Sequence, residues 1–412
     1  MRIVRKIKVL SIMIIAVLMA GVSLIQSYNA PVAKAAYAVQ NSTTVFNNPY
    51  GTLEEKRAII DTVAAGIDNA VAGSTIRIAV YSFTLSDIAD KLIAARDRGV
   101  NVHIVTDDHL YGSANAAADT AQMERLKIAL GTTVTTGTGS FIKICKDACM
   151  GTNIMHAKLF MFSQTGDSKL VTMLSSSNLT NTQINAWNNL YSVVGDQTLF
   201  DKMKWYFENM AKEPNTGNWY SSTSSGTNNI LTFPRTSYSS TSDDPYYSNL
   251  SKVKCTGVAS GYGSGGYTTI DVAMFQWTST RPAVAKKLSD LANAGCKVRV
   301  IISKKNYSKD PLVTLTSNSK IKVIDMDANI VDGEPGVYSH NKYMIINGYY
   351  DGSSSSKTVF TGSHNLSISA IKYNNELIIR IKDAVVYDKY LVNYNTMWPL
   401  GRTVTLAEAK AM

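Results

Sequence analysis

The sequence contains the same strand–helix–strand pattern twice, and this repeat restricts the fold more than any other feature. Residues 75–84 form a nearly continuous apolar run, which predicts a strand buried on both faces of a sheet. A helical segment at 85–99 ends in glycine, and a second predicted strand follows at 100–106. The same order of strand, helix and strand returns at 269–278, 282–295 and 297–303. Units of this length connect parallel strands through right-handed crossovers, so the repeat predicts a duplicated α/β protein.

Between the two repeats lies a segment of different composition. Residues 221–250 are rich in Ser, Thr, Asn and Tyr and show no sustained period, which predicts a linker. We therefore expect an N-terminal half at 36–220 and a C-terminal half at 251–412. Ligand sites commonly form between such units, so we expect the functional site between the halves.

The first 35 residues have the organisation of a secretory signal peptide. Residues 1–8 are basic, residues 9–25 are uncharged and mainly apolar, and Ala33-Lys34-Ala35 fits an A-x-A cleavage site. An uncleaved membrane anchor is the alternative, because an apolar run of 17 residues is near the short limit for a span. We expect a signal peptide at 1–35 and a secreted, extracellular protein.

Charge and composition limit the classes of partner. With 45% hydrophobic and 17% charged residues, the 412-residue chain is globular rather than disordered or a coiled coil. Its net charge of +10 includes five cations and no acids in the predicted signal peptide, which leaves 36 cations against 31 acids, or +5, elsewhere. This mildly basic body would tolerate anionic partners but does not by itself predict a groove for a polyanion.

Four cysteines remain in the exported part of the chain. An even number in an oxidising compartment predicts two disulfides. Of the three possible pairings we prefer Cys145–Cys149 with Cys255–Cys296, because each bond then stays within one half. A zinc site is the alternative, but the C-x3-C pair is followed by neither a second pair nor close histidines. We expect no metal.

Each half also contains a short polar motif after its repeat. In the first half, H-x-K at His156 and Lys158 is followed by a turn and a strand that ends in S-x-N. The second half repeats this order from His340 and Lys342. The spacing from the lysine to the asparagine is 20 residues in the first half and 23 in the second. The S-x-N residues are Ser176 and Asn178 in the first half and Ser363 and Asn365 in the second.

The motif combines the groups needed to bind and cleave a phosphodiester. Residues i and i+2 of a strand share a face, so each His and its Lys should point the same way. A pseudo-twofold arrangement would bring both pairs to one pocket, where two cations and several neutral donors form a cage for phosphate oxygens without a metal. One imidazole would attack phosphorus and the other would protonate the leaving oxygen. The predicted cage consists of Lys158, Lys342, Asn178, Asn365, Ser176 and Ser363.

Chance and structural roles are the alternatives for the histidines. A single H-x-K is common by chance, but two, each followed by S-x-N within a repeat, are hard to explain that way. His103 and His109 have no counterpart in the second half, so we expect them to be structural or at the pocket rim. His364 faces away from its motif neighbours on a strand, so we expect it to be structural.

The paired motifs resemble those of the phospholipase D superfamily, whose signature is H-x-K-x4-D with a downstream G-S-x-N, present twice in one chain. The resemblance extends over residues 48–397, and the predicted signal peptide makes the chain similar to secreted bacterial phospholipase D-like proteins. It implies two pseudo-twofold-related α/β/α halves, each with a mixed, largely parallel sheet. It also implies phosphodiester cleavage through a phosphohistidine intermediate, without a metal or other cofactor. In this pattern His156 would be the nucleophile, and His340 would be the general acid and then the base that activates water.

The sequence departs from the family pattern at the signature Asp. This residue is Ser163 in the first half and Asn347 in the second, which indicates a divergent branch. The first-half Gly of G-S-x-N is Ser175, a milder change.

A second departure concerns the carboxylate with which family members often orient a catalytic histidine. Matching Trp187-Asn188-Asn189 with Tyr373-Asn374-Asn375 assigns this supporting role to Glu376, toward His340. The corresponding first-half position is then Leu190, so the support for His156 is open. Because a carboxylate favours the protonated imidazole, this alignment agrees with His340 as the general acid.

Three functions are compatible with these residues. The first is a secreted phosphodiesterase that hydrolyses the head group of phospholipids, or transfers it to an alcohol, as a monomer at a membrane surface. The second is a secreted, metal-independent nuclease that uses the same site on nucleic acid. The third is a non-catalytic anion-binding protein with a decayed site. Export and the charge of +5 favour the lipid, and the presence of all four His and Lys residues argues against decay.

Overall fold

Both predicted strand–helix–strand repeats are present in the computed structural model, which describes residues 37–109, 117–327 and 336–412. Both pairs of strands are parallel, as expected for such units. The first strand of each repeat ends earlier than predicted, because the chain leaves the sheet there and turns toward the pocket described below. The elements are β2 (Thr75–Val80), α3 (Ser86–Asp97) and β3 (Asn101–Asp107), then β12 (Thr269–Met274), α7 (Pro282–Asn293) and β13 (Lys297–Ile302).

Two mixed sheets are built around these repeats. The first has the order β1 (Thr44–Phe46), β8 (Asn189–Val193), β6 (Ser168–Ser175), β5 (Leu159–Thr165), β2, β3 and β4 (Phe141–Cys145). The second has the order β19 (Arg402–Thr403), β14 (Ile321–Asp325), β13, β12, β16 (Lys342–Tyr350), β17 (Ser353–Gly362), β18 (Leu377–Ile381), β10 (Asn228–Thr232) and β9 (Ser221–Ser225), with β11 (Val253–Lys254) paired to β16. A two-stranded sheet of β7 (Ala186–Trp187) and β15 (Tyr338–Ser339) joins the halves.

The expected α/β class and mixed sheets are confirmed, but the sheets are not largely parallel. In the first sheet, β2 pairs in parallel with β3 and β3 with β4, whereas the strands from β1 to β5 and the β5–β2 pair are antiparallel. The physical reason is the connection between β5 and β6. These strands follow one another through a tight turn, and a turn this short can join only antiparallel neighbours.

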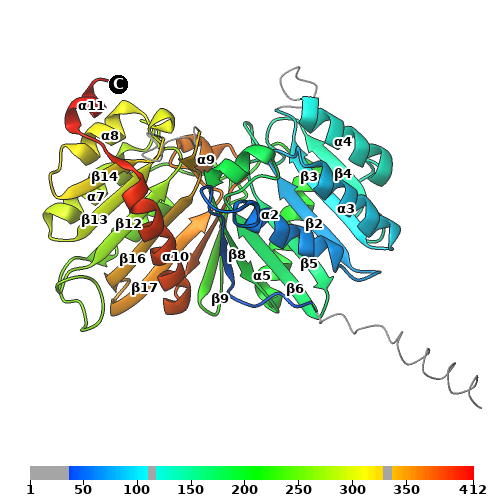
Figure 1. Cartoon of the computed structure of the whole chain (residues 1–412), viewed down its shortest axis with the longest axis horizontal. Helices are drawn as coiled ribbons and strands as arrows, with labels where there is room; N and C mark the ends of the chain where they lie inside the picture. The colour runs from blue at the N-terminus through cyan, green and yellow to red at the C-terminus, as the bar shows by residue number, and fades with distance from the viewer. Residues whose placement is uncertain (1–36, 110–116, 328–335) are drawn as a thin grey trace, which may run out of the picture. The chain divides into compact units, whose positions relative to one another are not determined.

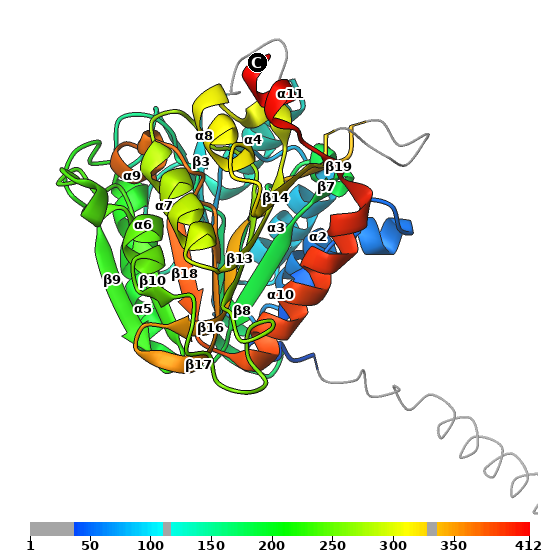
Figure 2. The same ribbon diagram turned by 90° about the vertical axis from the view of Figure 1, so that its left-hand side faces the viewer.

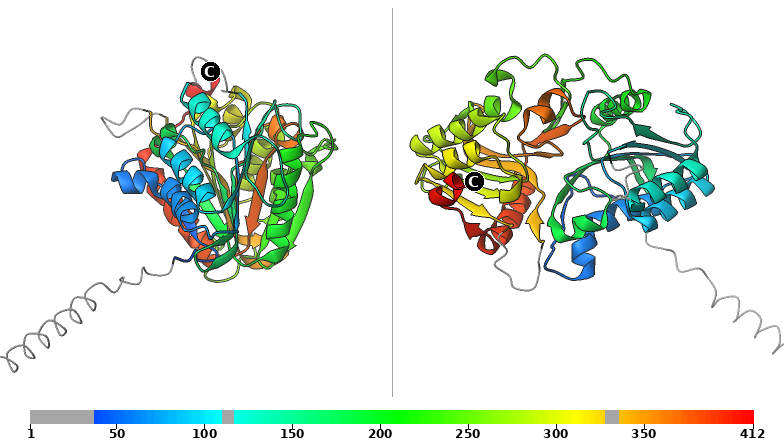
Figure 3. Two further views of the ribbon diagram at one scale, coloured as in Figure 1. Left: turned by 90° about the vertical axis from the view of Figure 1, so that its right-hand side faces the viewer. Right: turned by 90° about the horizontal axis from the view of Figure 1, so that it is seen from above.

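Helices cover the sheets in layers. The helices α2 (Leu53–Asp68), α3 and α4 (Ala117–Leu130) pack on the first sheet, and α7 and α8 (Lys309–Thr316) pack on the second (Figures 1 and 2). A third apolar core contains residues of both sheets together with α5 (Gln197–Lys212) and α10 (Ala384–Met397). Viewed from above, the two halves lie side by side along this core (Figure 3). The buried cluster of His156, Lys158, His340 and Lys342, called the pocket below, lies where they meet.

The segment 221–250, predicted to be a linker, belongs to the second half. It forms β9, β10 and α6 (Pro245–Leu250), and β10 pairs with β18 along its whole length. Asp244 caps α6 and accepts two hydrogen bonds from the buried Arg281, at 2.6 and 2.7 Å. Arg281 also donates to the carbonyl of Asn365, so the segment anchors the second S-x-N turn. Its Ser/Thr-rich edge strand β9 explains why its composition is that of a linker.

Two small helices complete the second half. They are α9 (Ile368–Lys372), which follows the second S-x-N turn, and α11 (Leu406–Lys410) near the C-terminus. No helix in the described ranges is long and apolar enough to cross a membrane. The predicted signal peptide lies outside the described residues.

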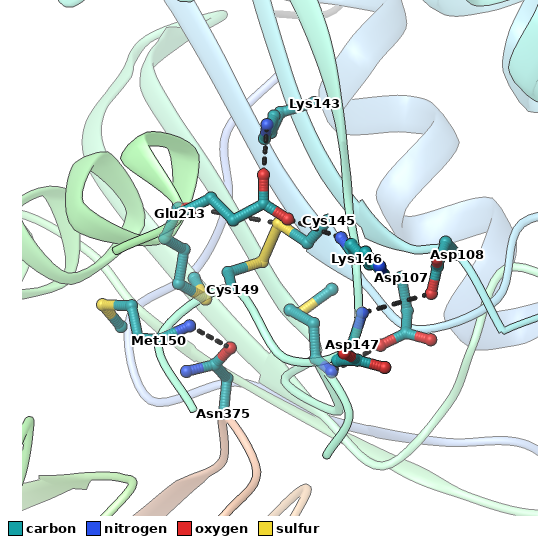
Figure 4. The surroundings of a disulfide bond; sticks show 12 residues. Asp107, Asp108, Lys143, Cys145, Lys146, Asp147, Cys149, Met150, Glu213 and Asn375 are labelled. Carbon is teal, nitrogen blue, oxygen red and sulfur yellow. Dashed lines mark hydrogen bonds and ion pairs between the residues drawn. A yellow bond between two sulfur atoms is a disulfide. The ribbon is translucent and has the colours of Figure 1, made fainter. Parts of the chain in front are cut away.

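Both predicted disulfides are present, and they join Cys145 to Cys149 and Cys255 to Cys296. The first closes a loop at the end of β4 (Figure 4), where the Lys146 backbone N–H donates to the Glu213 carboxylate. The same loop reaches the second half, because the Met150 N–H donates to the Asn375 side chain at 3.2 Å. The first disulfide therefore fixes a loop that connects the halves.

The two disulfides should contribute unequally to stability. In the chain-entropy description, removing the Cys255–Cys296 bond by a double Ser replacement should lower the free energy of unfolding by about 4 kcal/mol, against about 2 kcal/mol for Cys145–Cys149. Urea unfolding of the oxidised variants at pH 7 measures both values. Equal losses, or a larger loss for Cys145–Cys149, would show that native contacts of the short loop outweigh chain entropy.

Candidate active site

The two H-x-K motifs lie just before strands rather than inside them. His156 precedes β5, and His340 lies between β15 and β16. Each lysine side chain folds back on its own motif. Lys158 Nζ donates to the His156 carbonyl and Lys342 Nζ to the His340 carbonyl, both at 2.7 Å. Each His–Lys pair therefore forms one compact unit, and the two units have matching geometry.

His156 is supported by the second half of the chain. Its Nδ1 lies 2.8 Å from Glu376 Oε1, and its backbone N–H donates to the Asn375 carbonyl at 3.0 Å. The hydroxyl of Ser363 donates to the other oxygen of Glu376. The prediction that Glu376 supports His340 is therefore wrong, because this carboxylate contacts the histidine of the opposite half.

His340 is supported by the first half in the same way, but by an amide. Its Nδ1 lies 3.0 Å from Asn188 Oδ1, and its backbone N–H donates to the Trp187 carbonyl at 2.9 Å. The Asn188 amide nitrogen donates to the Ala186 carbonyl at 3.1 Å, which directs the amide oxygen toward the ring. Because that oxygen only accepts hydrogen bonds, His340 carries a proton on Nδ1.

These contacts identify Asn188 as the counterpart of Glu376. The alignment that placed Leu190 there is wrong by two residues. Ser176 donates to Asn188 at 2.9 Å as Ser363 donates to Glu376, across 12 and 13 residues of sequence respectively. The second-half connection is one residue longer, which hides the correspondence in the sequence.

The expected phosphate-binding serines have another role. The hydroxyls of Ser176 and Ser363 are used to hold Asn188 and Glu376, so they do not point freely into the pocket. The asparagines of the two motifs differ from the serines in this respect. Asn178 and Asn365 are both 8% exposed, and the side-chain oxygen of each has no hydrogen-bond partner. Phosphate binding by Asn178 and Asn365 stays a prediction.

Two buried ammonium groups give the pocket a surplus of positive charge. Lys158 and Lys342 are 1% and 0% exposed. Burial lowers the pKa of Lys158 to about 7, although Glu376 and Asp107 oppose this change. Burial and the charge of Lys158 lower the pKa of Lys342, against the effect of Glu376. An anion placed between the two lysines would restore their ordinary preference for the charged form.

The two catalytic candidates are neutral histidines in the unliganded pocket. Burial lowers the pKa of His156, and Lys158, Lys342 and His109 lower it further. Burial and the same two lysines lower the pKa of His340. With the proton of each neutral ring on Nδ1, toward Glu376 or Asn188, the ring's lone pair is on Nε2.

Aromatic rings from outside the two motifs lie beside both histidines. The Tyr81 ring meets His156 edge-on with centroids 5.2 Å apart, and the Phe275 ring meets His340 in the same way at 4.5 Å. Tyr338 lies 6.2 Å from His340. Tyr81 directly follows β2 and Phe275 directly follows β12, so an aromatic residue at the end of each repeated strand was the available signal.

The remaining histidines occupy the expected kinds of place. His103 contacts the Gly139 carbonyl at 3.0 Å, and burial lowers its pKa to about 4. Burial and Arg281 lower the pKa of His364 to about 3. His109 is at the pocket, where it stacks on Tyr81 at 3.7 Å and lies 3.1 Å from the buried Asp107.

The substituted positions of the family signature still serve the sheets. Ser163 accepts the Thr75 N–H at 2.8 Å, and Asn347 accepts the Gly263 N–H at 3.0 Å. Gly362 has φ +145°, and a Cβ there would lie 2.2 Å from the Leu377 carbonyl oxygen. In the first half Ser175 fits the equivalent place and donates to the Asn189 carbonyl at 2.7 Å.

Comparison with known proteins agrees with this geometry. A family model described as "Cardiolipin synthase, PLD-like domain" matches residues 63–211 and 266–398, which together make up more than half of the chain. Both H-x-K and both S-x-N motifs lie within these ranges. The chain belongs to the phospholipase D superfamily.

Curated relatives in this superfamily match a shorter stretch. A phospholipase D of Rickettsia conorii is 35% identical over 100 residues, which are 24% of this chain and 43% of the relative. A phospholipase D of Rickettsia prowazekii is also 35% identical over 100 residues, which are 42% of its length. The chain thus matches less than half the length of these relatives.

Solved structures share the fold at low identity. A phosphatidylserine synthase of Haemophilus influenzae superposes with a TM-score of 0.60 and 12% identity, over 90% of each chain. A polyphosphate kinase of Porphyromonas gingivalis superposes with a TM-score of 0.53 and 11% identity, over 86% of this chain and 50% of the kinase. At these identities the likeness concerns the fold alone.

If the site cleaves phosphodiesters, substitutions of Glu376 and Asn188 should change kcat/KM in different ways. Glu376→Gln keeps the shape of the side chain but removes the negative charge behind His156. We expect kcat/KM for bis(p-nitrophenyl) phosphate to fall about 10³- to 10⁴-fold at every pH. Circular dichroism should be unchanged. A loss below tenfold would show that the carboxylate has no part in the reaction.

Asn188→Asp is the matched change behind His340. A carboxylate there should raise the low pKa of this histidine. If protonated His340 is required, wild-type kcat/KM should have its maximum below pH 6.5 and fall as the pH rises, because the proton is then lost. In Asn188→Asp this fall should move to higher pH. A fall that stays in place, or moves to lower pH, would contradict a role for protonated His340.

Proposed function

We propose that this chain is a secreted phosphodiesterase of the phospholipase D type, which hydrolyses the head group of phospholipids through a phosphohistidine on His156. The observation that carries the proposal is the buried cluster of two neutral imidazoles and two lysines, with a carboxylate behind one imidazole. Such a cluster attracts a phosphodiester, supplies a nucleophile and supplies a proton carrier within one pocket.

The contact with Glu376 supports His156 as the nucleophile. Attack through Nε2 leaves a phosphorylated imidazolium, whose positive charge the carboxylate at Nδ1 stabilises. His340 has an amide at the same position, so its protonated form lacks this stabilisation and gives up a proton more readily. The proposed roles are those that the family resemblance implies, but the physical reason that supports them differs from the one expected.

In the first step, the lone pair on His156 Nε2 forms a bond to phosphorus. The bond from phosphorus to the head-group oxygen breaks, and that oxygen takes the proton from Nε2 of protonated His340. The negative charge of the bound phosphodiester offsets Lys158 and Lys342, which favours this protonated state of His340.

In the second step, His340 is neutral and takes a proton from water. The water oxygen bonds to phosphorus as the phosphorus–nitrogen bond breaks, which releases phosphatidic acid and restores His156. An alcohol in place of water would give transfer of the phosphatidyl group. Neither step needs a metal, because the lysines carry the charges that face the phosphate oxygens.

Several observations support a lipid over a nucleic acid. The description of the matched family model names a lipid enzyme, cardiolipin synthase, and the curated relatives are named phospholipase D. Three basic residues in β13 and in the turn after it have partners within the chain, which weakens the case for a polyanion strip there. Lys297 stacks on Tyr267, Arg299 is paired with Asp271 at 2.7 Å, and Lys305 stacks on Tyr338.

A direct comparison of substrates tests this choice. Purified mature protein is incubated in EDTA with vesicles of mixed phospholipids and, separately, with plasmid DNA. We expect phosphatidic acid to form and the plasmid to stay intact. Cleavage of the plasmid without phosphatidic acid would establish the nuclease instead. Activity that EDTA abolishes and Zn²⁺ or Ca²⁺ restores would contradict the lysine cage.

The covalent intermediate can be located directly. Rapid quenching without acid, followed by mass spectrometry, should find phosphate on His156. His340→Asn should form this intermediate from a p-nitrophenyl ester, whose leaving group needs no proton, but should hydrolyse it slowly. Phosphate on His340 in the wild type, or a phosphoenzyme in His156→Asn, would reverse the two roles.

A further inference from the structure

The rings of Tyr81 and Phe275 contact the lysines as well as the histidines. Lys158 Nζ lies 5.3 Å from the centroid of Tyr81, and Lys342 Nζ lies 4.6 Å from that of Phe275. In each half, one ring therefore meets the imidazole edge-on and the ammonium of the same motif at cation–π distance. Both rings are half-buried at the pocket.

Lys342, the lysine of the second half, has less negative charge near it than Lys158 has. The groups that act on Lys342 are the charge of Lys158, which opposes its own, and the carboxylate of Glu376. Glu376 is already held by His156 and Ser363. Lys158 has Asp107 in addition. Two groups that the Lys342 ammonium contacts, the His340 carbonyl and the Phe275 ring, are neutral.

We propose that Phe275 and Tyr81 are positioning residues that favour the charged forms of Lys342 and Lys158 in the empty pocket. The electron-rich face of an aromatic ring attracts a cation, and it does so more strongly where water is excluded. A ring can supply this attraction without the full negative charge of a carboxylate, which would compete with the phosphate for the lysines. The same ring limits the rotation of the neighbouring imidazole.

This inference extends the proposed function to two further residues, and binding tests it without turnover. Inorganic phosphate is the probe, and its affinity is measured by calorimetry from pH 6 to pH 9. Wild-type binding should weaken as the pH rises and Lys342 loses its proton. In Phe275→Leu this weakening should begin about 0.5 to 1 pH unit lower, with a three- to tenfold loss of affinity at pH 8.

The dependence on pH separates this role from a structural one. At pH 6, where a larger fraction of Lys342 carries its proton than at pH 8, Phe275→Leu should bind phosphate within about twofold of wild type. Phe275→Tyr keeps a ring and should restore the wild-type profile. Tyr267→Leu is the control, because this ring lies over Lys297 at the start of β13. It should leave the profile unchanged.

Two results would overturn the inference. One is an equal loss of phosphate affinity at pH 6 and pH 8 in Phe275→Leu, and the other is an unshifted profile. Should Phe275→Leu fail to fold, Tyr81→Leu provides the same measurement at Lys158. Phosphate binding with the expected shift, but no cleavage of any phosphodiester, would refute the proposed function and leave this inference standing. Phospholipid cleavage with an unshifted profile would do the reverse.

Discussion

The arrangement of the pocket depends on an exchange of hydrogen bonds between the halves. Each catalytic candidate receives its supporting acceptor from the opposite half, and its backbone N–H donates to a carbonyl of that half. These groups are buried, so leaving them unpaired would cost about 1 to 3 kcal/mol each. The position of each imidazole is therefore determined by the docking of the halves and not by its own half alone.

Charge in the pocket follows from the same burial. Two ammonium groups are held where water cannot solvate them, and the nearby carboxylate of Glu376 is shared with His156 and Ser363. The unliganded site is therefore electrostatically unfavourable, and a phosphate monoanion improves it. Binding and proton transfer are coupled, because an anion that offsets the positive charges of the two lysines also raises the proton affinity of His340.

The sequence was sufficient for the parts of this picture that are local. Apolar strands and a glycine-terminated helix predicted both repeats, and the cysteines predicted both disulfides. The H-x-K motifs were found from the sequence, but they lie just before their strands and not inside them. The partner of each histidine could not be predicted, because it depends on contacts between residues more than 150 positions apart. Matching the two aromatic–Asn–Asn triplets then placed Leu190, rather than Asn188, opposite Glu376, and the difference in loop length accounts for one of these two residues.

The segment 221–250 shows a different limit. Ser and Thr on an exposed edge strand have the composition of a linker, and the pairing of β10 with β18 decides otherwise. Ser176 and Ser363 show the same limit on a smaller scale. Serine is a residue type that suits a phosphate cage, but a hydroxyl can donate only one hydrogen bond. In each half a buried side-chain oxygen beside the serine accepts that hydrogen bond.

The exchanged supports also bear on how such a chain could have arisen. A single half cannot orient its own histidine, whereas two identical halves could orient each other's. In such a symmetric pair both supporting residues would be the same, so both histidines would have the same proton affinity. A carboxylate behind one and an amide behind the other requires two halves of different sequence, which a single chain with two halves supplies. Joining the halves thus makes it possible for equivalent residues to specialise.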